Sequence, residues 1–130
     1  MKSHIFREYD IRGIVGDELT KDDAAVIGSA IGTFFRRSNA KRIAIGFDAR
    51  ESSPAFCDIV TEKLVETGCD AVSIGRVPTP VLYHTIYTSD VDGGIMITGS
   101  HNPPDHNGFK ICLGEETLFG ERIQEIKKIA

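Results

Sequence analysis

A loop that contains a serine, a histidine, an amide and a lysine is the part of the sequence best equipped for chemistry. Ser100 follows a short apolar run, residues 94–97, which is typical of a buried strand. His101 and Asn102 come next, and Lys110 lies one short loop further on. A serine hydroxyl is a poor nucleophile unless its surroundings activate it and stabilise the product. The segment therefore predicts a nucleophilic serine, presented at a strand end beside polar and cationic groups.

Other kinds of site are disfavoured by the spacing of the residues. A hydrolase nucleophile elbow, G-x-S-x-G, needs a glycine two residues after the serine, and Asn102 occupies that position. A triad could be drawn from Ser100, His101 and Asp105, but neighbouring side chains usually diverge, which places His101 poorly for taking the serine proton. No G-x-G-x-x-G motif follows a strand, so a dinucleotide site is unsupported. HExxH, clustered Cys/His and EF-hand patterns are also missing, and no autonomous metal site is indicated.

Two segments resemble the sequence motifs of one enzyme family. Residues 98–111 read TGSHNPPDHNGFKI, and residues 6–13 read FREYDIRG. Together with FDAR at 47–50 and PTP at 78–80, they resemble the α-D-phosphohexomutases over essentially the whole chain. The opening segment is most similar to the phosphomannomutase/phosphoglucomutase branch. In the serine-loop segment, His106 stands where this branch would be expected to have a tyrosine, and we assign His106 no mechanistic role.

The resemblance implies catalytic roles for four residues. Ser100 would carry the phosphoryl group, and Lys110 would act in proton transfer and phosphate stabilisation. Arg12 would reach the phosphoserine, since the guanidinium fork suits phosphate oxygens and stays charged. His101 would orient and hydrogen-bond groups beside the serine.

Three further residues are expected to bind substrate or phosphate. Tyr9 matches a tyrosine that supports the family's site, and Asn102 flanks the serine. Arg50 is expected to face the same cleft from the end of a neighbouring strand. A structural role for Asp48 and Arg50, as a pair that ties the loop, is an open alternative.

The implied reaction is the reversible transfer of a phosphoryl group between the 1- and 6-positions of mannose or glucose phosphates. It would pass through a phosphoserine and a hexose 1,6-bisphosphate, with one Mg²⁺ bound partly through the phosphate on Ser100. The family has four domains, and this chain resembles only the first. Its implied partners are therefore hexose phosphates, the bisphosphate and the missing domains, which would hold most of the metal site. We expect the chain to fold alone without completing turnover. The alternatives are a non-catalytic phosphosugar- or partner-binding domain, a structural fragment and a serine hydrolase, which the missing elbow disfavours.

Helix and strand patterns alternate along residues 1–130, which we interpret as a single domain. They predict a three-layer α/β/α fold like the first domain of phosphoglucomutase, with a mostly parallel sheet and one antiparallel strand. Ligands in such sheets bind at the carboxyl ends of strands, which puts Asp48, Arg50 and Ser100 on one rim. The expected strands are 42–47, 70–75, 93–98 and 108–113. The first two expected helices follow caps at Thr20 and Ser53, the third opens at Thr79, and the last begins at about Phe119.

Composition excludes some classes of partner. The formal net charge is −4 and hydrophobic residues make up 41% of the chain, as in ordinary globular proteins. This charge argues against a nucleic-acid-binding protein that relies on a basic surface. Three cysteines without a CxxC pair, and no apolar signal or membrane segment, predict reduced thiols and a cytoplasmic location.

Overall fold

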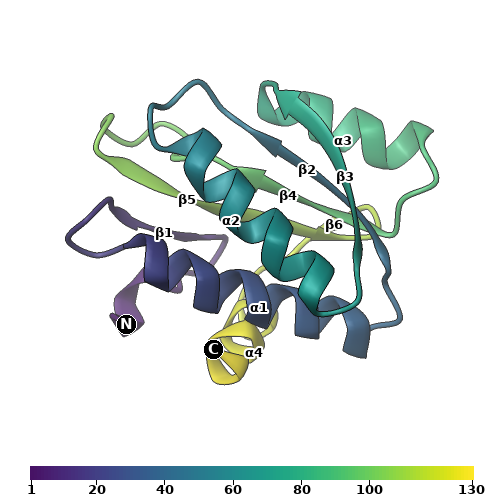
Figure 1. The fold of residues 1–130 in the computed structure, drawn as a ribbon, viewed down its shortest axis with the longest axis horizontal. Helices are drawn as coiled ribbons and strands as arrows, with labels where there is room; N and C mark the ends of the chain where they lie inside the picture. The colour runs from purple at the N-terminus through teal and green to yellow at the C-terminus, as the bar shows by residue number, and fades with distance from the viewer.

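One six-stranded sheet organises residues 1–130 in the computed structural model (Figure 1). Its main strands lie in the order β1-β5-β4-β2-β3, and β6 pairs with β5. Strands β3 and β4 are parallel to β2, whereas β5 is antiparallel to β1, β4 and β6. Only β5 therefore runs against the other strands, which confirms the predicted mixed sheet with one antiparallel strand. The strands are β1 (Ile11–Ile14), β2 (Arg42–Phe47), β3 (Asp70–Arg76), β4 (Gly93–Ile97), β5 (His106–Leu113) and β6 (Glu116–Thr117).

Helices cover both faces of the sheet, and alternate strand residues point to each face. Ile43 and Ile45 of β2 belong to the larger core, whereas Ala44 between them belongs to a smaller core on the other face. The larger core includes residues of α1, α2 and α4, and the smaller one is formed under α3 by Leu82 and Ile86. Figure 1 shows α1 beside α2, with α4 next to α1. The helices are α1 (Lys21–Arg37), α2 (Ser53–Glu66), α3 (Thr79–Thr88) and α4 (Glu121–Ile129), after a short 3₁₀ turn, η1 (Ser3–Ile5).

Local sequence signals explain most helix ends. Thr20 caps α1 by accepting the Asp23 amide at 3.1 Å, and the Asp23 carboxylate accepts the Thr20 amide at 2.9 Å. Gly68 follows α2 with a φ of +97°, a conformation that side chains rarely adopt. None of the helices combines the length and apolarity that a membrane span requires. The three cysteines are unpaired and buried, as expected.

Two expected helix starts were wrong. The cap of α2 is Ser52, because Ser53 already lies in the first turn and donates its hydroxyl to Asp48. Helix α4 begins at Glu121 after Gly120, whose φ of +55° interrupts the helical path. Phe119 consequently lies outside the apolar face of α4 and is 62% exposed. Strands β1 and β6 were not expected from the sequence, since both are too short for a clear alternating pattern.

Gly32 of α1 lies directly against Thr67, the residue that follows α2. A Cβ atom added there would lie 2.0 Å from the Thr67 hydroxyl oxygen. At Gly28 the nearest atoms would be the Cβ of Lys63 at 3.1 Å and the Cα of Val60 at 3.2 Å. Both glycines therefore allow close helix packing, and Gly32 is the less tolerant of a side chain.

Replacing Gly32 by alanine should destabilise the chain. The clash with Thr67 should outweigh the roughly 1 kcal/mol that alanine gains in helix propensity, giving a net loss of about 1–2 kcal/mol. Urea unfolding followed by circular dichroism would measure this. Gly28→Ala is the matched control and should cost less. Thr67→Ala added to Gly32→Ala should recover part of the loss, because it removes the hydroxyl and methyl groups but keeps the Cβ, which would lie 3.0 Å from the added atom. A Gly32→Ala variant as stable as the parent would contradict this account of the interface.

Candidate active site

Three adjacent strands bring the candidate residues to one region of the sheet. Arg12 of β1 lies opposite Gly108 of β5, and the Gly108 carbonyl accepts the Thr98 amide at the end of β4 at 3.0 Å. A Cβ atom on Gly108 would lie 2.7 Å from the Cβ of Arg12 and 2.1 Å from the Ile11 carbonyl oxygen. Glycine is therefore required at this position. Because Gly108 has no side chain, nothing on β5 at this position separates Arg12 from the start of the serine loop.

Ser100 has an unusual backbone and an unpaired hydroxyl. Its φ of +56° lies in the left-handed region, which typically costs a non-glycine residue about 1–3 kcal/mol and persists only when the surrounding structure holds it. Its amide donates to the Thr98 hydroxyl at 2.9 Å. The Ser100 Oγ is buried and has no hydrogen-bond partner. The hydroxyl is therefore not engaged in a structural hydrogen bond, and no neighbouring side chain in this chain contacts it to activate it.

The Arg50 guanidinium is the main support of the serine loop. Its Nε contacts Asp48 Oδ2 at 3.2 Å, and its side chain is 14% exposed. The remaining N–H groups donate to four carbonyl oxygens, those of Ser100 at 3.0 Å, Asn102 at 2.7 Å, Pro103 at 2.5 Å and His106 at 3.0 Å. Since all five donors are engaged, these contacts favour the loop-tying alternative over phosphate binding by Arg50.

Asp48 is held as a carboxylate by its neighbours. Its Oδ1 accepts the Ser53 hydroxyl at 2.5 Å and the Arg50 amide at 3.0 Å, and its Oδ2 accepts the Gly99 amide at 3.2 Å. Burial alone would raise the pKa of Asp48, but these hydrogen bonds and one from Thr98 outweigh it and lower the pKa below its ordinary value. The end of β2 is thereby joined through one charged group to the end of β4.

The two candidate cations share a buried partner that the sequence analysis missed. Asp10, whose side chain is only 6% exposed, lies 3.4 Å from Arg12 Nε through Oδ1 and 3.8 Å from Lys110 Nζ through Oδ2. No hydrogen bond or ion pair joins Lys110 to Ser100; Lys110 is paired in register with Met96, before the end of β4. The available signal was the position of Asp10 two residues before Arg12, which puts both on the same side of an extended chain.

The other candidate residues occupy the loop and its surroundings. His101 is exposed, and Tyr9 is 67% exposed; neither makes a side-chain hydrogen bond. Asn102 folds back within the loop and donates its amide group to the Gly99 carbonyl at 2.8 Å. Asn107, a fully buried residue, donates to the hydroxyls of Ser52 and Ser53 at the start of α2. Its amide thus anchors the far side of the loop.

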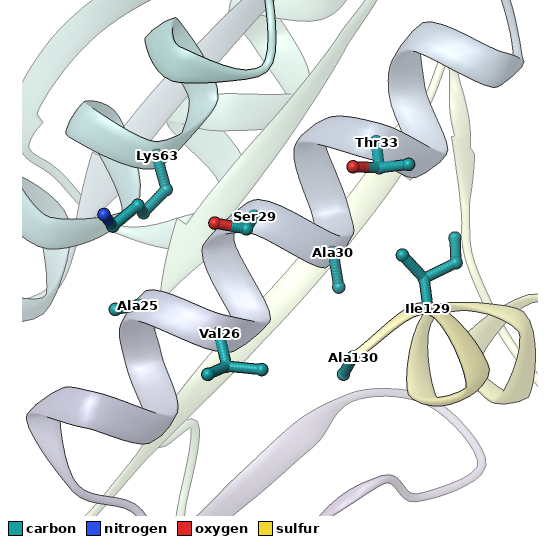
Figure 2. Close-up of a pocket in the computed structure, with 8 residues that line it drawn as sticks. All are labelled: Ala25, Val26, Ser29, Ala30, Thr33, Lys63, Ile129 and Ala130. Atoms are coloured by element: carbon teal, nitrogen blue, oxygen red, sulfur yellow. The ribbon is translucent and has the colours of Figure 1, made fainter.

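Two hollows differ in their chemical content. An open groove of about 570 Å³ borders the serine loop and is lined by residues 48–51 with Asn102 and Pro104. Another, of about 340 Å³, lies between α1, α2 and the end of α4 (Figure 2). Its only ionisable side chain is Lys63, which is paired with Glu66 at 3.0 Å. The candidate chemistry therefore lies at the loop and not in the hollow of Figure 2.

The fold and the site define an α/β/α domain that presents a serine hydroxyl at the carboxyl end of a buried strand. The chain belongs to the phosphoglucomutase/phosphomannomutase family, whose α/β/α domain I matches residues 3–130. The predicted family and branch are therefore confirmed.

Named relatives resemble this chain over nearly all of its length. It is 45% identical over 128 residues to a phosphomannomutase/phosphoglucomutase of Pseudomonas aeruginosa and 47% identical over 125 residues to a phosphoglucomutase of Neisseria gonorrhoeae. These matches cover 98% and 96% of the chain but only 28% and 27% of the relatives. A solved family structure from Burkholderia thailandensis superposes with a TM-score of 0.95 at 38% identity, covering 98% of this chain and 30% of that one. The chain thus spans less than a third of the length of its relatives.

The lowered pKa of Asp48 leads to a pH-dependent stability. A carboxyl group whose pKa is lower in the folded state stabilises the fold above its unfolded pKa, here near 3.8, and loses this effect as the pH falls through the folded value. Asp48→Asn should therefore cost about 1–3 kcal/mol at neutral pH, and the difference from the parent should shrink below about pH 4.

Urea unfolding from about pH 7 down to about pH 3 would measure this dependence. Asp58→Asn is the matched control, because Asp58 is an exposed carboxylate on α2 that accepts no hydrogen bond. Its unfolding free energy should follow that of the parent at every pH. A constant difference between Asp48→Asn and the parent across the range would show that the charge of Asp48 is not what supports the loop.

Proposed function

We propose that this chain is the catalytic-serine domain of a phosphohexomutase. Ser100 would exchange a phosphoryl group with the 1- and 6-hydroxyls of mannose or glucose phosphates, through a hexose 1,6-bisphosphate. The observation that supports this most directly is the Ser100 Oγ, which is buried, unpaired and carried on a left-handed backbone. A serine with only a structural role would have its hydroxyl satisfied by a neighbour.

Each half-reaction is a transfer between two oxygen atoms. The phosphorus–Oγ bond of phosphoserine breaks as a sugar hydroxyl oxygen forms a new bond to phosphorus. That hydroxyl loses its proton, and the Ser100 Oγ gains one, so the serine returns to its neutral form. The reverse transfer, from the other position of the bisphosphate, regenerates phosphoserine. Since such a reaction depends on positioning and charge neutralisation, cations beside the serine matter more than a strong base.

Arg12 and Lys110 are the proposed cations. Both are partly exposed, at 30% and 24% of their side chains, and both are tethered to Asp10 at 3.4 and 3.8 Å. The Arg12 Nε is buried toward Asp10, but its two Nη groups donate no hydrogen bond, which leaves that side of its fork available to phosphate oxygens. Lys110 would neutralise charge and move the proton between the sugar hydroxyl and bulk solvent. His101 and Tyr9 would contact substrate from exposed positions, and Asn102 would shape the loop between them.

Magnesium is part of the proposal, with most of its ligands outside residues 1–130. No group of three or more His, Cys, Asp or Glu side chains here could hold a metal ion. The residues therefore fit a metal only through a phosphate on Ser100, and the bound ion would neutralise phosphoryl charge. The other ligands, like the sugar-recognition residues, would come from the additional length that the relatives possess. A cytoplasmic location remains a prediction.

The isolated chain should not catalyse mutase turnover, whereas a chimera should. The chimera replaces the matching 128 residues of the Pseudomonas aeruginosa relative with this chain. With glucose 1-phosphate, Mg²⁺ and glucose 1,6-bisphosphate, a coupled assay should detect turnover by the chimera only. Ser100→Ala should lower its turnover by a factor of at least about 10⁴, because the phosphoryl carrier is lost.

Phosphate should be found on Ser100 by mass spectrometry of the chimera after exposure to the bisphosphate. Ser89→Ala, a change in the loop after α3, is the matched control and should leave turnover unchanged. Phosphosugar binding without phosphate on Ser100 would indicate a non-catalytic binding domain. Turnover by the chain alone, abolished by Ser100→Ala, would refute the proposal that the other domains are required.

A further inference from the structure

We infer that Arg50, held by Asp48, is a positioning residue that fixes Ser100 in its left-handed backbone conformation and thereby aims its hydroxyl. The catalytic consequence rests on the proposed function of Ser100, while the conformational part stands on the loop geometry alone. Four observations carry the inference: the Arg50 contacts, the Asp48 contacts, the space at Gly99 and the backbone of Ser100.

The contacts of Arg50 span both limbs of the serine loop. Its Nη2 donates to the carbonyls of Ser100 and Asn102, on the limb that leaves β4. Its Nη1 donates to the carbonyls of Pro103 and His106, the second of which already belongs to β5. One planar group therefore closes the loop from within. Lysine, with a single point of attachment and no fork, could not make this set of contacts.

Asp48 fixes the position of that guanidinium. It contacts Arg50 Nε at 3.2 Å and also accepts the Arg50 amide, so the side chain is tethered at its base and at its head. The same carboxylate accepts the amide of Gly99, the residue before Ser100. The clamp formed by Asp48 and Arg50 is thus anchored on β2, and it holds the loop from the neighbouring strand.

Gly99 fits the clamp because it has no side chain. A Cβ atom at this position would lie 2.3 Å from Arg50 Cζ and 2.5 Å from Nε. The guanidinium consequently packs directly on the backbone that leads into Ser100. A methyl group there would displace the guanidinium without removing any of its donors, which makes Gly99 an independent test position.

Both peptide groups around Ser100 are held. Its amide donates to the Thr98 hydroxyl at 2.9 Å, and its carbonyl accepts from Arg50 Nη2 at 3.0 Å. With both fixed, φ and ψ of Ser100 are set, and a φ of +56° persists although it is unfavourable for serine. Removing Arg50 frees the carbonyl side. The backbone should then relax to negative φ, which redirects the Oγ.

Nuclear magnetic resonance of the 130-residue chain tests the conformational part. In Arg50→Ala and Arg50→Lys, backbone shifts and couplings of Ser100 should report negative φ, and the amides of Ser100 and Asn102 should exchange faster with solvent. Arg76→Ala is the matched control, because Arg76 ends the adjacent β3 and packs over the Phe47 ring at 5.8 Å. It should leave the loop unchanged. If Ser100 kept its left-handed backbone in Arg50→Lys, the inference would be overturned. Arg50→Lys also provides the test if Arg50→Ala fails to fold.

The catalytic part is tested in the chimera by separating kcat from KM. Misplacing the nucleophile should lower kcat by about 10- to 100-fold in Arg50→Lys, with little change in KM for glucose 1-phosphate. Gly99→Ala should have a similar effect. Combining it with Arg50→Ala should add little, because both changes disrupt the same clamp. Fully additive losses, or an unchanged kcat in Arg50→Lys, would overturn the inference.

The outcomes distinguish this inference from the proposed function. If the parent chimera never carries phosphate on Ser100 but the variants lose the left-handed backbone, the proposed function fails and the clamp stands as a conformational device. If the parent is phosphorylated and Arg50→Lys is phosphorylated equally fast, the function stands and the clamp has no catalytic role. Ethylguanidinium added to Arg50→Ala should partly restore kcat, whereas a lost stabilising contact elsewhere would not respond to it.

Discussion

The antiparallel insertion of β5 between β4 and β1 is the constraint on which the site depends. It pairs Gly108 with Arg12 on one side and with Thr98 on the other, so an arginine near the N-terminus comes beside a serine loop almost ninety residues later. A purely parallel sheet would need a helical crossover between β4 and its neighbour, which would remove the short loop altogether. The direction of one strand therefore decides both the length of the serine loop and the identity of the residues facing it.

Two carboxylates organise the charges around that strand in different ways. Asp48 receives hydrogen bonds from neutral groups as well as from Arg50, and its role is to fix backbone. Asp10 meets only the cations Arg12 and Lys110, at distances of 3.4 and 3.8 Å that are long for strong hydrogen bonds. Asp10 therefore keeps the two cations close together without a short hydrogen bond to either. Asp48 thus fixes the backbone of the serine loop, whereas Asp10 keeps two cationic side chains close together.

More of the fold than of the candidate site could be predicted from the sequence. Helical periodicity and a capping pattern at Thr20 predicted α1 because those signals are local. The contacts of Arg50 could not be read in the same way, since its acceptors lie about fifty residues away and are backbone carbonyls that leave no mark on residue type. The shared role of Asp10 was missed because Lys110, its partner on β5, becomes a neighbour only once β1 pairs with that strand. Ser100 was singled out from its position after an apolar strand and from the family motif, while its left-handed backbone emerged only from the structure.

The arrangement of layers explains why the candidate site is open. Helix α3 packs on β2 and β4, and its small core ends at Cys112 on β5. Lys110 lies two residues before Cys112, on the same face of β5, but beyond the cover of α3, and Arg12 lies further still from that helix. The half of this face that carries the cations is therefore uncovered by any helix of the domain. A covering surface would have to come from outside these 130 residues, which agrees with a domain that matches less than a third of the length of its relatives.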